Sequence, residues 1–519
     1  MTATFAVRTG PRQPSLGRNV LSNWAVLAFH LVVSFFLSPF IVRHLGNTAY
    51  GIWVLIVSLT SYMQLADFGV RNAVTRYVSR FQAQGDHESA SRIVSTAVGF
   101  FLITGLFAVI AAATAALFAI RLFNIPEMYQ PQIRVALWLA GANVATYLIK
   151  GTFAGCAAGL QRFEAMNAID MALGAFRALG AVMTLRAGGG IVGLALVELA
   201  YTSAGCVAQF WLSFRIYPEL RVRLRLFTRQ HLTMILSFSV FSFLLDVAME
   251  LIYYTDVFVI GAFLPLGSVA FFSVAANLRN YSRSLIAGLA HALTPAASKL
   301  EAQTRHDELK RFLSAGARNA SLIMLPIAAT FMLRGRTFIG LWMGREYGEL
   351  SGPVLYVLSV AALFSASSQI AQSVVLGIGR HKAVVPVFLA QGLWSMVLAV
   401  ALVYSKGIVG VAWATTIPSL ATSLVFWPWF MRRTVGFPIG DYIISAWVRP
   451  GLAVMPFAVC TYAFERLLPP SNLFVFFLQV GAALPLALLG SWVFCFGRHE
   501  RQSIVQKVRT VFSVIFKRS

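Results

Sequence analysis

The chain has 519 residues, of which 58% are hydrophobic and only 12% are charged, a balance that leaves too little polar surface for a soluble protein of this length. The net charge of +23 would indicate nucleic-acid binding in a soluble chain, but here the basic residues stand in short gaps between long apolar runs. Composition therefore indicates an integral membrane protein and excludes a nucleic-acid partner.

The apolar runs are long enough to cross a bilayer, because a spanning helix needs about 20 mostly apolar residues. They predict an all-α membrane protein of about fourteen spans. The predicted spans lie near residues 20–42, 49–78, 93–119, 133–156, 166–186, 190–214, 232–262, 268–297, 312–333, 352–377, 384–404, 408–431, 448–467 and 473–496.

The distribution of Lys and Arg predicts the orientation. An even number of spans puts both termini on one side, and most basic residues fall in the gaps on that side. The opposite gaps hold fewer, namely Arg43, Arg121, Arg186, Arg334, Arg336, Arg345, Lys406 and Arg466. This excess predicts cytoplasmic termini. Residues 497–519 are expected to form a basic amphipathic tail on the cytoplasmic leaflet, with a disordered tail as the alternative.

Short matches recur along the chain at a nearly constant offset, which indicates an internal repeat. Leu45–Tyr50 resembles Leu266–Phe271, Ala83–His87 resembles Ala302–His306, Gly159–Arg162 resembles Gly377–Arg380, and Gly190–Gly193 recurs as Gly407–Gly410. The second copy starts after six spans, so the repeats are parallel six-helix lobes. The predicted parts are an N-terminal lobe (1–214, spans 1–6), a C-terminal lobe (215–431, spans 7–12), spans 13–14 (432–496) and the tail (497–519).

Several ionisable residues fall at membrane depth, where each costs at least ~2.5 kcal/mol unless it faces water or protein. The polar and charged candidates are Asn23 and His30 in span 1, Asp67 and Arg71 in span 2, Asp246, Glu250 and Asp256 in span 7, and Arg279 and Arg283 in span 8. By helical rise, Asp246 matches Arg283 at a depth of about 21 Å, and Glu250 matches Arg279 at about 27 Å.

These charges allow two interpretations. They are either buried ion pairs that fix helix register or the lining of a hydrated cavity that contacts an anionic ligand or a coupling cation. We favour the cavity, because Asp67, Arg71 and the polar stripe of span 1 supply a facing wall. His30 alone is more typical of a satisfied interior histidine. The four cysteines lack metal-ligand spacing, and no metal or cofactor is expected.

The stretch Leu45-Gly46-Asn47-Thr48-Ala49-Tyr50-Gly51-Ile52-Trp53, followed by Asp67-Phe68-Gly69-Val70, resembles the opening of the polysaccharide flippases of the multidrug/oligosaccharidyl-lipid/polysaccharide (MOP) exporter superfamily. Weaker matches are Gly159–Phe163 and Phe338–Gly344. The resemblance implies two six-helix lobes around a V-shaped cleft and no enzymatic activity. It also implies a polyprenyl-diphosphate-linked oligosaccharide moved from the inner to the outer leaflet of the bacterial cytoplasmic membrane, in surface polysaccharide biosynthesis.

In this interpretation Arg71, Arg279 and Arg283 face the substrate's phosphates, because the planar guanidinium fork suits phosphate oxygens. Asn23 and His30 are further substrate-binding candidates. The acids are expected to hold the arginines or to bind a coupling cation, and they are Asp67, Asp246, Glu250 and Asp256. Membrane lipids, a polysaccharide polymerase and chain-length proteins are the candidate partners.

Three alternatives remain. A lipid II flippase of the same superfamily usually carries arginines on span 1, and this chain has none between Arg18 and Arg43. A multidrug or cation antiporter usually has twelve spans and an acid-dominated cavity. A polyprenyl-dependent glycosyltransferase or polymerase is expected to display acids or a long catalytic loop on the outer side. Here the largest outer gap, residues 334–351, is short, and it holds Glu346 and Glu349 with no histidine beside them.

Overall fold

The computed structural model describes residues 16–498, 500–502 and 506. Within these residues all regular structure is helical and no β-strand occurs. The predicted amphipathic helix of the C-terminal tail lies largely outside the described residues and stays a prediction.

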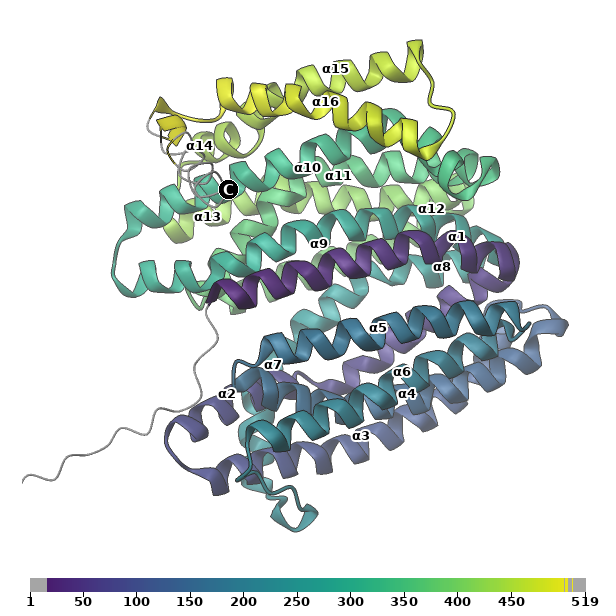
Figure 1. The fold of residues 1–519 in the computed structure, drawn as a ribbon, viewed down its shortest axis with the longest axis vertical. Helices are drawn as coiled ribbons and strands as arrows, with labels where there is room; N and C mark the ends of the chain where they lie inside the picture. Colours follow the sequence, from purple (N-terminus) through teal and green to yellow (C-terminus); the bar gives the residue numbers. More distant parts are fainter. Residues whose placement is uncertain (1–15, 499, 503–505, 507–519) are drawn as a thin grey trace, which may run out of the picture. The chain divides into compact units, whose positions relative to one another are not determined.

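The helices follow one another with short connections (Figure 1). The α-helices are α1 (Leu16–Met63), α2 (Val70–Ala83), α3 (His87–Leu122), α4 (Gln130–Gly159), α5 (Phe163–Arg186), α6 (Gly190–Ile216), α7 (Arg229–Tyr253), α8 (Thr255–Phe263), α9 (Leu266–Ala302), α10 (His306–Met343), α11 (Arg345–Gly377), α12 (Val385–Ala421), α13 (Trp427–Val435), α14 (Ile439–Ile443), α15 (Arg449–Leu467) and α16 (Leu473–Phe494). Short 3-10 turns η1 (Gln64–Asp67), η2 (Glu127–Tyr129), η3 (Leu224–Leu226) and η4 (His381–Ala383), and π-helical segments η5 (Thr422–Phe426) and η6 (Ile444–Val448), connect them.

Ten helical stretches among the described residues are long and apolar enough to cross a membrane, which confirms the predicted all-α membrane fold. Two of these stretches contain a sharp break, at Gly46 and at Gly407, where the backbone is not helical. The long helices α4 and α9 are not among the ten, and both carry charges in their interior. The number of fourteen crossings therefore stays a prediction.

The described chain forms two compact units. Unit 1 comprises residues 16–46 and 59–246, and unit 2 comprises residues 47–58 and those from 247 onward. The division falls inside α7, whereas the sequence predicts lobe boundaries at residues 214 and 431. Those boundaries stay a prediction.

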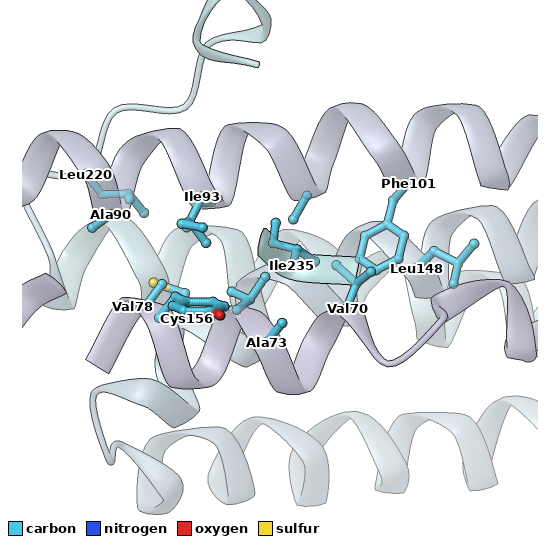
Figure 2. Packing of buried hydrophobic residues seen from close by; sticks show 14 of the residues in the cluster. Val70, Ala73, Val78, Ala90, Ile93, Phe101, Leu148, Cys156, Leu220 and Ile235 are labelled. Atoms are coloured by element: carbon cyan, nitrogen blue, oxygen red, sulfur yellow. The ribbon is translucent and has the colours of Figure 1, made fainter. Parts of the chain in front are cut away.

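Unit 1 is built around α2, which packs on α3 and α4, while α6 covers another face of α4 (Figure 1). The buried core between these helices is apolar, with Val70 and Ala73 from α2, Ile93 and Phe101 from α3, and Leu148 from α4 (Figure 2). Each of these side chains is at most 1% exposed. The core fixes the position of α2, and with it the polar residues at its N-terminal end.

Unit 2 contains a fully buried arginine that the sequence places in an outer loop. Arg334 lies inside α10 and is 1% exposed. Its Nε donates to Glu465 Oε2 of α15 at 2.8 Å, and its guanidinium carbon lies 4.6 Å from the centroid of the Phe476 ring of α16. Thr461 of α15 and Gln479 of α16 accept further hydrogen bonds. The predicted outer gap at 334–351 is helical except at Gly344, which alone separates α10 from α11, and its place outside the membrane stays a prediction.

The internal repeat is visible in the turns. α4 ends at Gly159 and α11 ends at Gly377, the matched residue of the second copy. A Cβ added at Gly159 would lie 2.7 Å from Thr75 O, and one at Gly377 would lie 2.6 Å from Thr294 O. Two residues later both copies adopt a positive φ, 57° at Gln161 and 73° at Gly379. The same close helix contact and the same turn therefore occur in both units.

Candidate functional site

Span 2 is broken at membrane depth, although its sequence predicts one continuous helix over residues 49–78. The helix stops at Met63, passes through η1 and restarts at Val70. Phe68 (φ 49°, ψ 23°) and Gly69 (φ 71°, ψ 11°) both adopt the left-handed conformation. A bulky residue such as Phe68 rarely adopts this conformation, and such backbone strain is often kept at functional sites.

The break gathers charges at the start of α2. The backbone N–H of Arg71 donates to Asp67 Oδ1 at 3.1 Å, so the carboxylate caps the new helix end. The Arg71 side chain extends over Gly151 of α4, where an added Cβ would lie 3.7 Å from Arg71 Cδ. Asp246, exposed on α7, lies within electrostatic range of both Asp67 and Arg71. The structure thus brings three of the predicted site residues together.

His30 pairs with an acid that the sequence analysis did not single out. Its Nε2 donates to Asp170 Oδ2 of α5 at 2.9 Å, and the Tyr201 hydroxyl of α6 donates to Asp170 Oδ1 at 2.8 Å. The side chains of His30 and Asp170 are 38% and 36% exposed, so the pair is not sealed inside the protein. The expectation that His30 is a satisfied interior histidine therefore fits its hydrogen bond but not its exposure.

Two basic residues continue this network. Lys150 of α4 places its ammonium nitrogen 5.1 Å from the centroid of the Tyr201 ring and lies within electrostatic range of Asp170 and Arg71. On the other side, Arg177 Nε of α5 donates to Glu198 Oε1 of α6 at 2.7 Å. Lys150 therefore connects the Arg71 cluster to the His30 pair, and cations and acids alternate through unit 1.

The polar stripe of span 1 also meets α5. The amide nitrogen of Asn167 donates to Asn23 Oδ1 at 2.6 Å and to Ser22 Oγ at 2.9 Å. Asn23 and His30 thus both face α5. The sequence signal for these missed partners was present, since Lys150, Asp170, Arg177 and Glu198 are ionisable residues within predicted spans.

In unit 2 the break between α7 and α8 at Tyr254 precedes a buried acid. Asp256 is 3% exposed, and the Thr415 hydroxyl of α12 lies 2.9 Å from its Oδ1 and 2.8 Å from its Oδ2. Asp256 also lies within electrostatic range of Arg279. A buried carboxylate needs such partners, because an isolated charge in an apolar medium is very costly.

Arg279 and Arg283 lie one helical turn apart on α9 and share one aromatic ring. Their guanidinium carbons lie 5.4 Å and 4.0 Å from the centroid of the Tyr253 ring. Among the described residues, the buried Nε and Nη2 of Arg279 and the buried Nε of Arg283 have no hydrogen-bond acceptor. Buried donors of a charged group are expensive to leave unsatisfied. The pair therefore forms a cationic site with three buried donors that no described residue satisfies.

The two predicted acid–base pairs of spans 7 and 8 remain predictions. Asp246 and Arg283 fall in different units, and Glu250 is half-buried on α7, in the same unit as Arg279. Asp256 is the acid whose charge acts most strongly on Arg279.

Several known proteins are similar to this chain in sequence or in fold. A family model described as polysaccharide biosynthesis protein matches residues 16–301. EpsK of Bacillus subtilis, an uncharacterised membrane protein, is 20% identical over 447 residues, which are 85% of this chain and 88% of EpsK. A putative O-antigen transporter of Shigella flexneri is 18% identical over 394 residues, which are 76% of this chain and 92% of the transporter.

Among solved structures, the inward closed form of the lipid II flippase MurJ superposes with a TM-score of 0.72 at 14% identity, over 92% of this chain and 98% of MurJ. An inward-facing multidrug resistance transporter of the MATE family, in the MOP superfamily, superposes with a TM-score of 0.67 at 17% identity, over 80% of this chain and 98% of that transporter. These likenesses establish the fold. Because the family model covers more than half of the chain, this multi-pass membrane protein belongs to the polysaccharide biosynthesis protein family, and the resemblance to the polysaccharide flippases of the MOP superfamily is confirmed.

Proposed function

We propose that this protein flips a polyprenyl-diphosphate-linked oligosaccharide from the cytoplasmic to the outer leaflet of the bacterial cytoplasmic membrane. The product would feed the synthesis of a surface polysaccharide such as O-antigen, capsule or exopolysaccharide. The observation that carries the proposal is the Arg279–Arg283 pair on α9, whose buried guanidinium donors have no acceptor among the described residues.

The chemistry of such a substrate matches this pair. A diphosphate offers several anionic oxygens, and two guanidinium groups one helical turn apart present forked donors to them. Tyr253 lies against both guanidinium groups and supports their orientation. A phosphate would accept hydrogen bonds from the buried donors that no described residue satisfies. Removing either arginine would leave the negative charge of the bound phosphate unbalanced in a low-dielectric site.

The charges of unit 1 fit the polar headgroup. A sugar chain placed in hydrocarbon would leave many polar groups unpaired, each at a cost of several kcal/mol. The partly exposed residues Asn23, His30, Arg71 and Asp170 supply donors and acceptors at membrane depth. They would replace water around the headgroup during its passage, while the two predicted lobes open alternately to the two sides of the membrane.

The acids have two roles in this proposal. Asp67 holds the start of α2 through its hydrogen bond to the Arg71 backbone, and Asp256 balances the charge of Arg279. Asp246 and Glu250 are the candidates to bind a coupling cation, because a carboxylate at membrane depth is a typical proton or sodium site. The protein would carry no enzymatic activity of its own. It would deliver the flipped lipid-linked oligosaccharide to a polymerase and chain-length proteins on the outer side of the membrane.

The test is export in a strain that lacks this gene. We expect the deletion strain to accumulate inward-facing lipid-linked oligosaccharide and to lose its surface polymer. The wild-type gene should restore both, whereas Arg279→Ala and Arg283→Ala should each lower export about a hundredfold, as expected for a lost charge-assisted phosphate contact of roughly 3 kcal/mol. Arg121→Ala, at the exposed end of α3, is the matched control and should export normally.

Membrane abundance of every variant is measured in parallel, so that misfolding is recognised. Full export by Arg279→Ala and Arg283→Ala at normal abundance would refute the assigned phosphate site. Unchanged surface polymer in the deletion strain, with no second transporter of this family present, would overturn the proposed function. Arrest of peptidoglycan synthesis in place of polymer loss would favour a lipid II flippase.

A further inference from the structure

An apolar groove opens on unit 1 at the break of span 2. It has a volume of about 640 Å³, within the range of sites that hold drug-sized ligands. α3, α7 and the segment around η1 form its walls. The side chains that shape it are aromatic or aliphatic, chiefly Tyr62, Phe68, Phe100, Ile103, Phe107 and Phe243.

The strained residue of the break forms one wall of this groove. Phe68 lies between two other aromatic rings, with its ring centroid 5.0 Å from that of Phe243 and 5.9 Å from that of Phe100. A regular helix through this position would not require the left-handed backbone of Phe68. The strained backbone therefore helps to form the groove, because the break places Phe68 as one of the three central aromatic rings of the groove.

The groove faces the lipid side of the protein. Ile103 is 54% exposed and Phe107 is 65% exposed, and both lie in the middle of α3. By helical rise, they lie roughly 24–30 Å from the start of α3 at His87, which is hydrocarbon depth for a helix that begins at a membrane surface. A ligand in the groove would therefore enter from the bilayer and not from water.

A charged cluster borders the groove. On the break segment, Phe68 lines the groove and Arg71 follows three residues later. On α7, Phe243 lines the groove and Asp246 follows three residues later. Arg71 and Asp246 lie within electrostatic range of each other, and Lys150 lies within range of Arg71. The site is thus divided into an apolar groove and an adjoining polar patch in which the cations Arg71 and Lys150 stand beside Asp67 and Asp246, as an amphiphile with a charged headgroup requires.

We propose that this groove holds part of the polyprenyl tail of the transported lipid as it enters, while its diphosphate lies at Arg71 before it reaches Arg279 and Arg283. This inference rests on the proposed function and names where the substrate's tail lies during headgroup entry. Bilayer lipids are as apolar as the groove, so burial alone gives no preference, and selectivity must come from shape and dispersion contacts. The flat isoprene double bonds of a polyprenyl chain match the faces of the three central aromatic rings better than flexible saturated acyl chains do.

Photo-crosslinking from inside the groove tests the proposal. A benzophenone amino acid replaces Ile103, and the same amino acid at Leu117, which is 66% exposed on α3 outside the groove, is the control. The full-length protein is reconstituted in vesicles that contain either a radiolabelled long-chain polyprenyl phosphate or a radiolabelled saturated phosphatidylglycerol. We expect the Ile103 probe to label with polyprenyl phosphate about tenfold more than with the phospholipid, a preference of about 1.4 kcal/mol. The Leu117 probe should label equally with both lipids.

A blocking variant gives a second readout. Ala111→Trp fills the groove from an exposed position of α3, and Leu117→Trp adds the same ring outside it. Ala111→Trp should abolish polyprenyl labelling at Ile103 and lower export about tenfold, whereas Leu117→Trp should change neither.

Equal labelling by both lipids, or polyprenyl labelling that persists in Ala111→Trp, would overturn the groove assignment. Normal export by Ala111→Trp would do so as well. These failures differ from failure of the proposed function, because the deletion strain and the Arg279 variant test export without reference to the groove. Selective labelling in a protein that exports no polymer would leave the groove assigned and remove the transport role.

Discussion

The two units share their turns and differ in their charges. Both copies of the repeat end a helix at a glycine in close contact with a neighbouring helix, at Gly159 and Gly377. At membrane depth the likeness stops. Unit 1 keeps its ionic groups partly exposed, with Asp170 at 36%, whereas unit 2 buries Asp256 to 3% and Arg334 to 1%.

The helix breaks have diverged in the same way. Unit 1 breaks its second span at Phe68 and Gly69, while unit 2 interrupts its first span at Tyr254. Turn geometry and close helix contacts tolerate few residue types, so both copies retain them. Under the proposed function the charges at membrane depth are set by the ligand and not by the fold, so they differ between the two copies.

The largest expected effect is at Arg334. Arg334→Ala should lower the free energy of unfolding by about 3–5 kcal/mol, because it breaks a mostly buried ion pair and leaves Glu465, 19% exposed, without its cationic partner. Denaturation of the purified protein in mixed micelles measures this. Arg336→Ala, at an exposed arginine of α10 that pairs with Glu349 of α11, should cost at most about 1 kcal/mol. Equal losses in both variants would contradict the buried network.

Substitutions at Asp256 of unit 2 and Asp170 of unit 1 test the difference in burial between the two units. Asp256→Asn removes the charge that balances Arg279 in a buried site and should cost about 2–3 kcal/mol. Asp170→Asn should cost about 1 kcal/mol or less, since its pair with His30 is not sealed inside the protein. The same denaturation assay measures both variants. A larger loss from Asp170→Asn would reverse the comparison.

The shared contact is tested by a matched pair of substitutions. Gly159→Ala and Gly377→Ala each place a methyl group within 2.7 Å of a backbone oxygen on the neighbouring helix. Both should lower the free energy of unfolding by about 1–3 kcal/mol, as overpacking does. Gly451→Ala, with nothing within 4 Å of the added atom, is the control and should be neutral. A strongly unequal effect at the two glycines would show that the repeat is not equivalent there.

The smallest effect concerns the first glycine of the fourth sequence match, which is Gly190 in one copy and Gly407 in the other. Gly190 and Gly407 occupy matched positions and have φ values of 53° and 56°. Ala at either should cost about 1–2 kcal/mol through backbone strain alone, because no atom lies closer than 3.8 Å to the added methyl. Thermal unfolding in detergent suffices to detect it. No change at either position would mean that the backbone there relaxes freely.

The sequence predicts the membrane fold and the repeat well, because both depend on hydrophobic length and on glycine-bearing turns. It also identifies Asp67 and Arg71 as one cluster, since they are neighbours along the chain. It does not predict the break at Phe68, because a hydrophobic run looks the same whether or not its helix is interrupted. It does not pair His30 with Asp170, or Arg334 with Glu465, because such partners meet only after distant helices pack.

The buried arginine of α10 has a consequence for synthesis in the cell. Its partner Glu465 lies 131 residues further along the chain. At 5–20 residues per second, the ribosome needs roughly 7 to 26 seconds to deliver that acid after Arg334 has been made. During this interval a cation sits in a newly inserted helix without its counter-ion. Chains that end before α15 would keep this unpaired arginine in the membrane, which is the kind of defect that membrane quality-control proteases remove.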